Sequence, residues 1–167
     1  VLRATEERMQ QLANYDTLTG LPNRTLLTQL LTQAMTASRR DKDEGALLAI
    51  DIYRFTSIND TLGHEVGDEL LRQIAGRFRT ALRAEDVLAR VGGDEFIVAL
   101  LKITKREHSA IVAEKLLAAL NTPFHIADNE LHISASIGIA VYPEDGVEVS
   151  GILRFADVAM KRMQKNG

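Results

Sequence analysis

The stretch Arg90-Val91-Gly92-Gly93-Asp94-Glu95-Phe96-Ile97-Val98 constrains the fold of this chain more than any other. Two glycines stand between two short apolar runs, and this pattern predicts a tight β-hairpin. Glycine permits positive backbone torsion angles and lets a bulky ligand approach the main chain. Asp94 and Glu95 follow the glycines at once, and their carboxylates suit a hard cation such as Mg²⁺. The same residues also fit an ordinary turn without a ligand.

The size and composition of the chain fit one globular domain. Its 167 residues are 46% hydrophobic and 26% charged, as in ordinary soluble proteins. No apolar run approaches the ~18 residues of a membrane span, so we expect a cytoplasmic fragment without membrane contact. The absence of cysteine excludes disulfides and thiolate metal sites. A net charge of -3 offers no basic face for nucleic acid.

The pattern of residues 1–14 predicts a connector helix, which is separate from a domain at residues 15–167. Its apolar seam recurs at spacings of three and four among charged residues, at Leu2, Thr5, Met9 and Leu12. The chain begins inside this pattern and without a methionine, so we expect the helix to continue a coiled-coil connector from an upstream domain. A helix packed on its own domain would carry the same pattern.

An acid interrupts the compact apolar run at residues 46–55. The letters Ala-Leu-Leu-Ala-Ile-Asp-Ile-Tyr-Arg-Phe predict a buried strand, and its one acid is Asp51. An ionised carboxylate in apolar surroundings is costly. Asp51 must therefore be paired, hydrogen-bonded or bound to a metal.

A polar segment at residues 57–68 leads into an amphipathic helix. Asn59, His64 and Asp68 lie on the approach to this helix or in its first turn. An Asn amide and an Asp carboxylate can together read the edge of a guanine, which offers a carbonyl acceptor beside two donors. Asn-Asp and Gly-Asp pairs are also ordinary turn and capping residues, and a lone histidine is usually a satisfied polar group.

The remaining segments alternate between helix and strand. Further helices are predicted from Pro22 to about Met35, over residues 105–120 and over residues 149–164. Strands at residues 124–126 and 131–141 flank a hairpin signal at Asp128-Asn129. Interspersed strands and helices with at least two hairpins predict the α+β (mixed α/β) class, with a central sheet covered by helices.

Five spaced segments occur together in this chain. They are Asp-x-Leu-Thr-Gly-Leu-Pro-Asn-Arg at 16–24, the acid-bearing strand leading to Asn59-Asp60, Gly-His-x-x-Gly-Asp at 63–68, Arg-Val-Gly-Gly-Asp-Glu-Phe at 90–96 and Ser-Ile-Gly-Ile-Ala at 136–140. In this order they resemble the GGDEF domain, the diguanylate cyclase family. The resemblance covers roughly residues 14–167. It implies a mostly antiparallel sheet wrapped by helices, related to nucleotidyl cyclase and polymerase palm domains.

The resemblance implies an enzyme that joins two GTP molecules into cyclic di-GMP and releases pyrophosphate. Asp51 and Asp94, with the Ile52 carbonyl, would bind Mg²⁺ or Mn²⁺. Glu95 would be a further ligand or the general base for the attacking ribose 3′-hydroxyl. Such an acidic cluster suits cations that neutralise triphosphate charge. Each domain would hold one GTP, so catalysis would need a homodimer.

The resemblance places the nucleotide among the same motifs. Asn59 and Asp68 would read guanine, and His64 would lie in the nucleotide site. Phe55 would contact the substrate, and Gly92-Gly93 would leave room for its phosphates.

Arg83-Ala84-Glu85-Asp86, upstream of the hairpin, has the Arg-x-x-Asp form of the family's inhibitory site. By resemblance, Arg83 would grip a guanine edge or phosphate of the product, and Asp86 would bind a second guanine. The two residues alone also fit an i, i+3 surface ion pair at a helix end.

The chain departs from the family's pattern where phosphate would bind. The strand usually reads Asp-x-Asp-x-Phe-Lys, but Tyr53 replaces the second acid and Thr56 replaces the lysine. Met163-Gln164 stands where an Ala-Lys pair is usual. Nearby cations are expected on other faces of that helix: Lys161, Arg162 and Lys165. Losing two cations would weaken triphosphate binding by of order 1 to 3 kcal/mol each.

These departures leave an alternative open, a weakly active or inactive module that binds GTP or cyclic di-GMP and regulates an adjacent domain. The segments at residues 122–126 and 142–146 resemble GGDEF domains fused to a downstream EAL phosphodiesterase domain. We therefore expect the partners to be GTP, cyclic di-GMP, a second copy of the chain, an upstream sensory domain and a downstream EAL domain.

Overall fold

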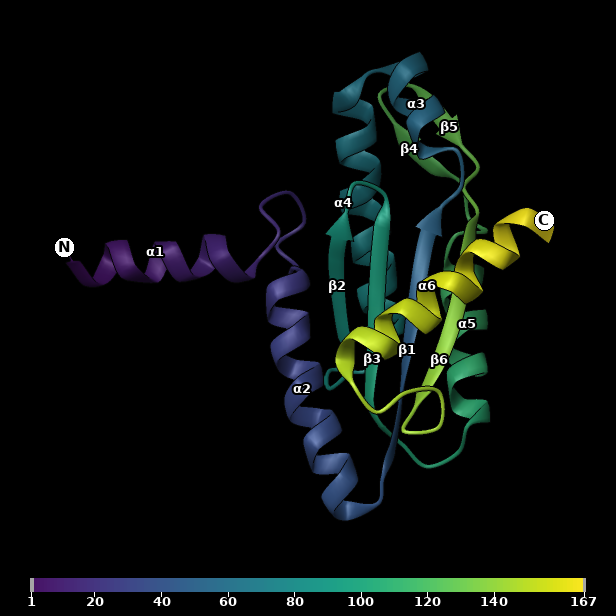
Figure 1. The fold of residues 1–167 in the computed structure, drawn as a ribbon. Coiled ribbons are helices and arrows are strands. Elements are labelled where there is room, and N and C mark those ends of the chain that lie inside the picture. Colours follow the sequence, from purple (N-terminus) through teal and green to yellow (C-terminus); the bar gives the residue numbers. More distant parts are fainter. Residues whose placement is uncertain (1, 167) are drawn as a thin grey trace.

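The computed structural model of this protein describes residues 2–166, with side chains from residue 3 to residue 165. The elements in chain order are α1 (Leu2–Asn14), α2 (Arg24–Asp41), β1 (Glu44–Ile52), α3 (Phe55–Leu62), α4 (His64–Ala81), β2 (Val87–Gly92), β3 (Glu95–Ile103), α5 (Glu107–Ala119), β4 (Phe124–Ile126), β5 (Asn129–Leu131), β6 (Ala135–Tyr142) and α6 (Val149–Asn166). Figure 1 shows them along the chain.

The centre of the domain is one antiparallel sheet with strand order β2-β3-β1-β6. The central strand β1 pairs with β3 on one side and with β6 on the other (Figure 1). The short strands β4 and β5 form a separate two-stranded ribbon. The predicted mixed α/β fold with a mostly antiparallel sheet is confirmed.

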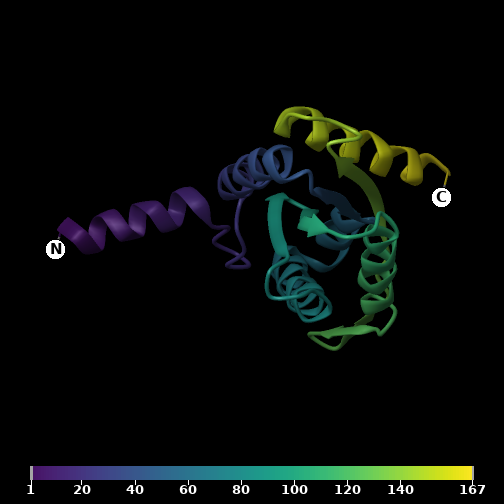
Figure 2. The same ribbon diagram turned by 90° about the horizontal axis from the view of Figure 1, so that it is seen from below.

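Helices cover both faces of this sheet (Figure 2). Leu48 and Ile50 of β1 pack in a core with α4 and α5, whereas Leu47 and Ala49 pack in a second core with α2 and α6. Because successive side chains of a strand point to opposite faces, Asp51 continues the series of Leu47 and Ala49. Its carboxylate is therefore turned toward α6.

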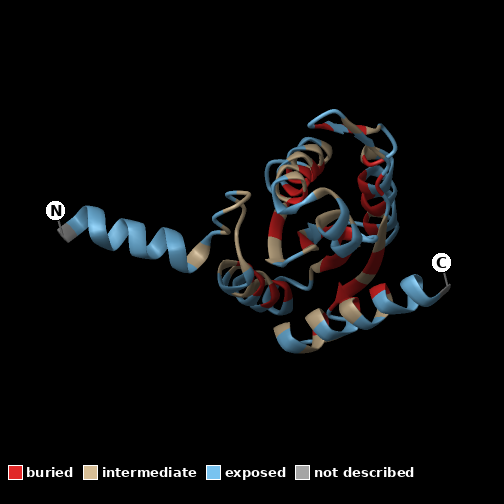
Figure 3. Cartoon of the chain, turned by 90° about the horizontal axis from the view of Figure 1, so that it is seen from above, coloured by how far each residue is buried: buried red, intermediate tan, exposed pale blue. Residues whose placement is uncertain are grey.

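Helix α1 projects away from the domain, and its side chains are exposed along most of its length (Figure 3). Met9 is 65% exposed and Leu12 is 54% exposed. In this structure α1 is therefore not packed along the domain over most of its length. A coiled coil with an upstream segment stays a prediction.

Two segments differ from the sequence-based expectation. The polar segment after β1 contains a helix of its own, α3, because Phe55 turns its ring into the core at 6% exposure. Gly63, at φ +95°, separates α3 from α4. The strand expected over residues 131–141 is divided, since β5 ends at Leu131 and β6 begins at Ala135.

The loop at residues 16–24 is fastened to the central hairpin by Arg90. Its guanidinium donates to Asp16 Oδ1 at 2.9 Å and to the Gly93 carbonyl at 2.8 Å. The backbone N–H of Arg90 donates to the Pro22 carbonyl at 3.0 Å. Asn23 then begins α2, because its side chain accepts a hydrogen bond from the Leu26 N–H at 3.1 Å. These bonds place the first turn of α2 beside the hairpin.

Gly138 explains the Ser-Ile-Gly-Ile-Ala segment. Strand β6 and helix α6 approach so closely there that a Cβ atom on Gly138 would lie 2.2 Å from the Ala156 carbonyl oxygen and 2.2 Å from the Met160 nitrogen. Both neighbours are backbone atoms and cannot rotate away. The missing side chain therefore sets the height of α6 above the sheet.

We expect Gly138→Ala to lower the free energy of unfolding by about 1 to 3 kcal/mol, the usual cost of overpacking. Gly76→Ala is the matched control, because a Cβ atom there would meet nothing within 4 Å in the middle of α4. That substitution should raise stability by about 0.5 to 1 kcal/mol. Urea unfolding of both variants measures the difference, and equal stabilities would contradict the close contact.

Candidate functional site

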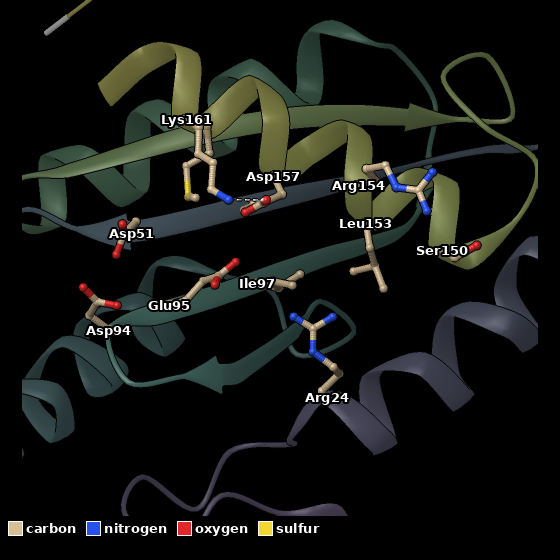
Figure 4. A pocket seen from close by; sticks show the side chains of 12 residues that line it. Arg24, Asp51, Asp94, Glu95, Ile97, Ser150, Leu153, Arg154, Asp157 and Lys161 are labelled. Atoms are coloured by element: carbon tan, nitrogen blue, oxygen red, sulfur yellow. Dashed lines mark ion pairs between the residues drawn. The ribbon is translucent and has the colours of Figure 1, made fainter. Parts of the chain in front are cut away.

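Three carboxylates meet at the end of the sheet where the central hairpin turns. Asp51 of β1 and Glu95 of β3 are register partners across the two strands, and Asp94 lies in the turn just before β3. All three line one cavity of about 460 Å³ between the sheet, α2 and α6 (Figure 4). The sequence predicted each acid separately, and the register of β1 with β3 brings them together.

The two oxygens of Asp51 have different surroundings. Oδ2 accepts a hydrogen bond from the Gln164 side-chain amide at 2.5 Å. Oδ1 is buried and has no hydrogen-bond partner among the described residues. Burial, followed by the contact with Asp94 and the charges of Asp94 and Glu95, raises the pKa of Asp51 to about 6, although the Gln164 bond opposes the shift.

The pKa of Glu95 is also raised, first by burial and then by the charge of Asp157 on α6. The charges of Arg24 and Lys161 act in the opposite direction. The site thus holds more negative charge than its own cations balance.

The acids suit a cation that is completed by a ligand. Asp51, Asp94 and Glu95 line one cavity, but among residues 3–165 no three acidic or histidine side chains lie close enough together to hold a metal ion by themselves. Mg²⁺ does not require such a set, because it is usually held by one or two carboxylates together with substrate phosphates and water. The unpartnered Oδ1 of Asp51, beside Asp94, is a free oxygen ligand of this kind.

The hairpin glycines do not adopt positive φ angles, contrary to the expectation from the sequence. The described glycines in the left-handed region are Gly20 and Gly63. A Cβ atom on Gly93 would meet nothing within 4 Å, and one on Gly92 would come no nearer than 3.8 Å to Glu95. Gly92 and Gly93 therefore keep the tip of the hairpin bare and leave space beside the acids.

The residues expected at a guanine lie outside the acidic cavity, on α3 and α4. The Asn59 side-chain oxygen is buried without a hydrogen-bond partner among the described residues. A Cβ atom on Gly67 would lie 1.7 Å from this oxygen, so the glycine makes room for the Asn59 amide next to Asp68. His64 is exposed at the start of α4. Their contact with a base stays a prediction.

The N-terminus of α3 lies directly after the strand that carries Asp51. Its N-cap residue, Arg54, has a left-handed conformation (φ 56°, ψ 28°) and makes no side-chain capping bond. The Phe55 ring is buried in the core, so only the backbone of Phe55 could reach a ligand. The first N–H groups of a helix favour anions. Backbone donors are thus present where Thr56 replaces a lysine.

Arg83 and Asp86 do not form the ion pair that their spacing allowed. Asp86 is 8% exposed, and its Oδ2 accepts a hydrogen bond from the backbone N–H of Arg83 at 2.9 Å. Arg79 donates to the carbonyl oxygens of both residues and braces the turn. These hydrogen bonds hold the backbone of the turn, whereas the Arg83 side chain is exposed.

Sequence reasoning missed Arg24 and Arg154 as cations of the cavity and misplaced Lys161. Arg24 of α2 and Arg154 and Lys161 of α6 line the cavity together with the acids (Figure 4). The expectation that Lys161 lies on another face of α6 than Gln164 is wrong. Positions three apart on a helix lie on one side, so the spacing from Lys161 to Gln164 could have revealed this.

Replacing Asp51 should stabilise the protein at neutral pH. The folded state binds the Asp51 proton more tightly than the unfolded chain, since the pKa rises from 3.8 to about 6. Wild-type stability therefore falls as pH rises through this window. A shift of two units corresponds to about 3 kcal/mol, and solvent screening of this partly exposed group reduces it to about 1 kcal/mol.

We expect Asp51→Asn to unfold at higher urea concentration than the wild type at pH 8, and at nearly the same concentration at pH 4. Asp60→Asn, which changes an exposed acid on α3, is the control and should follow the wild type at both pH values. A stability gain at pH 4 equal to that at pH 8 would contradict the raised pKa.

Comparison with known proteins gives a consistent result. The chain matches the family model "Diguanylate cyclase, GGDEF domain" over residues 13–167. It is 43% identical to the bifunctional diguanylate cyclase/cyclic di-GMP phosphodiesterase MucR of Pseudomonas aeruginosa, over 99% of this chain and 24% of that protein. It is 38% identical to the cyclic di-GMP phosphodiesterase PdeR of Escherichia coli, over 99% of this chain and 24% of that protein. The chain thus spans about a quarter of the length of both relatives.

A solved structure agrees with the fold. The GGDEF domain of TpbB from Pseudomonas aeruginosa superposes with a TM-score of 0.89 at 37% sequence identity, over 92% of this chain and 90% of that chain. The family model matches nearly the whole chain, from the loop that Arg90 fastens to the hairpin through to α6. This protein therefore belongs to the GGDEF domain family.

Proposed function

We propose that this chain is a diguanylate cyclase domain that condenses two GTP molecules into cyclic di-GMP and pyrophosphate. The observation that carries the proposal is the grouping of Asp51, Asp94 and Glu95 around one cavity, with an unpartnered buried oxygen on Asp51. Family membership and the names of MucR and TpbB support the same activity. A reaction that consumes GTP also fits a cytoplasmic location.

Asp51 and Asp94, with the carbonyl of Ile52, would hold Mg²⁺ or Mn²⁺. The bound cation would neutralise triphosphate charge and polarise the α-phosphorus. The Ile52 N–H donates to the Asp94 carbonyl at 3.1 Å, so the strand end and the hairpin turn are held together. Glu95 would be a further ligand or would accept the proton of the ribose 3′-hydroxyl, and its raised pKa fits a general base.

The nucleotide would extend from this edge over α3 toward α4. The uncapped N–H groups at the start of α3 would receive phosphate oxygens, and bare Gly92 and Gly93 would leave space for them. Asn59 and Asp68 would recognise the guanine edge, with His64 nearby. The unpartnered oxygen of Asn59 matches the N–H donors of guanine.

Catalysis would need a homodimer, because each domain holds one GTP and the reaction joins two. The exposed apolar residues of α1 would provide the contact that brings two domains face to face. An upstream sensory domain would then control the reaction through this helix.

Regulation of an adjacent domain is a second candidate function. Thr56 and Gln164 stand where lysines are expected, and PdeR is named a phosphodiesterase. In this alternative the domain would bind GTP or cyclic di-GMP and act on a downstream EAL domain, with little turnover of its own.

Activity distinguishes the two candidates. Incubated with GTP and Mg²⁺, a protein that retains α1 should form cyclic di-GMP, detectable by chromatography. Glu95→Gln should reduce the rate at least ~100-fold, as expected for loss of a general base or metal ligand. Glu114→Gln, an exposed acid on α5, is the control and should not change it. A dimer that binds GTP without making product would refute the cyclase and favour the regulatory module.

Arg83 and Asp86 would bind cyclic di-GMP as product inhibitor. We expect Arg83→Ala to weaken cyclic di-GMP binding at least ~10-fold by calorimetry, because a guanidinium can grip a guanine edge or phosphate. The Arg83 side chain is exposed, so unfolding midpoints should stay close to the wild type. Arg72→Ala, which removes an exposed arginine of α4, should leave affinity unchanged. If Arg83→Ala binds cyclic di-GMP as tightly as the wild type, Arg83 does not belong to a product-binding site.

A further inference from the structure

The cavity at the acidic edge carries positive as well as negative charge. Its lining contains the acids Asp51, Asp94, Glu95 and Asp157 and the cations Arg24, Arg154 and Lys161. A cavity lined by both kinds of charge is suited to a metal-bound phosphate chain, in which the metal cation meets the carboxylates and the outer oxygens meet ammonium or guanidinium groups.

Helix α6 supplies two of the three cations, Arg154 and Lys161, and Lys161 lies in a stripe of residues on one face of the helix. Asp157, Lys161 and Gln164 follow at i, i+4 and i+7, so they share one face of the helix. Gln164 bonds Asp51 at 2.5 Å, which fixes this face toward the acids. Lys161 lies one turn nearer the start of α6, and its ammonium group lies 3.0 Å from Asp157 (Figure 4).

Gln164 itself cannot neutralise phosphate, because its amide is uncharged and is already bonded to Asp51. Lys161 lies three residues away, about 4.5 Å along the helix axis, a gap that its flexible four-carbon stem can span. The hydrogen bond and charge of Asp157, together with the charges of Glu95 and Asp51, raise the pKa of Lys161. Lys161 is thus a cation in the lining of the cavity.

We propose that Lys161 is the phosphate-binding cation of this domain and supplies the charge that Thr56 and Gln164 lack. This inference rests on the proposed binding of GTP. In the ligand-free protein Asp157 holds the ammonium group at the cavity wall. On binding, the ammonium group moves from its ion pair with Asp157 to the terminal phosphates of the nucleotide.

Arg24 and Arg154 are the other cations in the lining of the cavity. Neither has an ion-pair partner within the part of the chain that the structure describes, so both guanidinium groups remain available to phosphate oxygens. They come from different elements, α2 and α6. A triphosphate or released pyrophosphate would therefore meet cations from two sides of the cavity.

Calorimetry with two nucleotides tests the role of Lys161. The first is a GTP analogue whose α–β bridging oxygen is a methylene group, which binds with Mg²⁺ without reacting. The second is GMP, which lacks the terminal phosphates. We expect Lys161→Met to weaken binding of the analogue about tenfold and to leave GMP affinity unchanged. Lys161→Arg, which keeps the charge, should retain most of the affinity for the analogue.

Arg162→Met is the matched control. Arg162 is the next residue on the same helix, is exposed, and does not line the cavity. Its replacement removes the same charge from the protein and should leave both affinities unchanged.

The outcomes separate this inference from the proposed activity. Equal affinity of wild type and Lys161→Met for the analogue would overturn the role of Lys161, whether or not cyclic di-GMP is formed. An equal loss of analogue affinity in Lys161→Met and Arg162→Met would also overturn it. The loss would then come from the lower net positive charge of the protein and not from a contact made by Lys161. Selective loss in Lys161→Met, in a domain that makes no product, would support the phosphate site and refute only catalysis. A wild type that does not bind the analogue would overturn both proposals.

Discussion

The pairing of the central strand β1 determines where every charged group of the site lies. Its residues alternate between two cores, so Asp51 continues the face of Leu47 and Ala49 and is turned toward α6. Antiparallel pairing with β3 places Glu95 directly opposite Asp51. A slip of one residue would turn Asp51 to the α4 face and separate the acids. Burial of aliphatic side chains on both faces of β1 fixes this register, so the apolar core also builds the acidic site.

The site has an electrostatic cost in the ligand-free protein. Burial and neighbouring acids raise the pKa values of both Asp51 and Glu95, which means that their charged forms are disfavoured in the folded state. Gln164 offsets part of this cost with one hydrogen bond to Asp51, and Lys161 adds a nearby positive charge. A divalent cation with its phosphate ligand would offset much more. Functional sites commonly retain such unfavourable groupings, because the ligand supplies the missing partner.

Local patterns in the sequence predicted the hairpin, the acid in a buried strand and the helix after the polar segment. These patterns were insufficient where contacts with residues distant in the sequence set the conformation or position of a side chain. Gly92 and Gly93 suggested unusual torsion angles, but in the structure they provide space beside the acids. The ion pair left open as an alternative for Arg83 and Asp86 does not form, because the buried Asp86 carboxylate accepts a backbone N–H. Lys161 was assigned to the wrong face of α6, although its spacing from Gln164 already contained the answer.

The sequence by itself determined the types and phases of the main elements, because alternating and helical hydrophobic patterns follow directly from backbone geometry. It also identified the acids, since Asp51 in an apolar strand demanded a partner. Only the tertiary structure decided which partner each group meets. The approach of α6 to β6 at Gly138, where no Cβ atom would fit, sets the helix over the sheet. That approach brings Gln164 to Asp51 and Lys161 into the cavity, across more than a hundred residues of chain. Such contacts depend on the packing of whole elements, which no local pattern encodes.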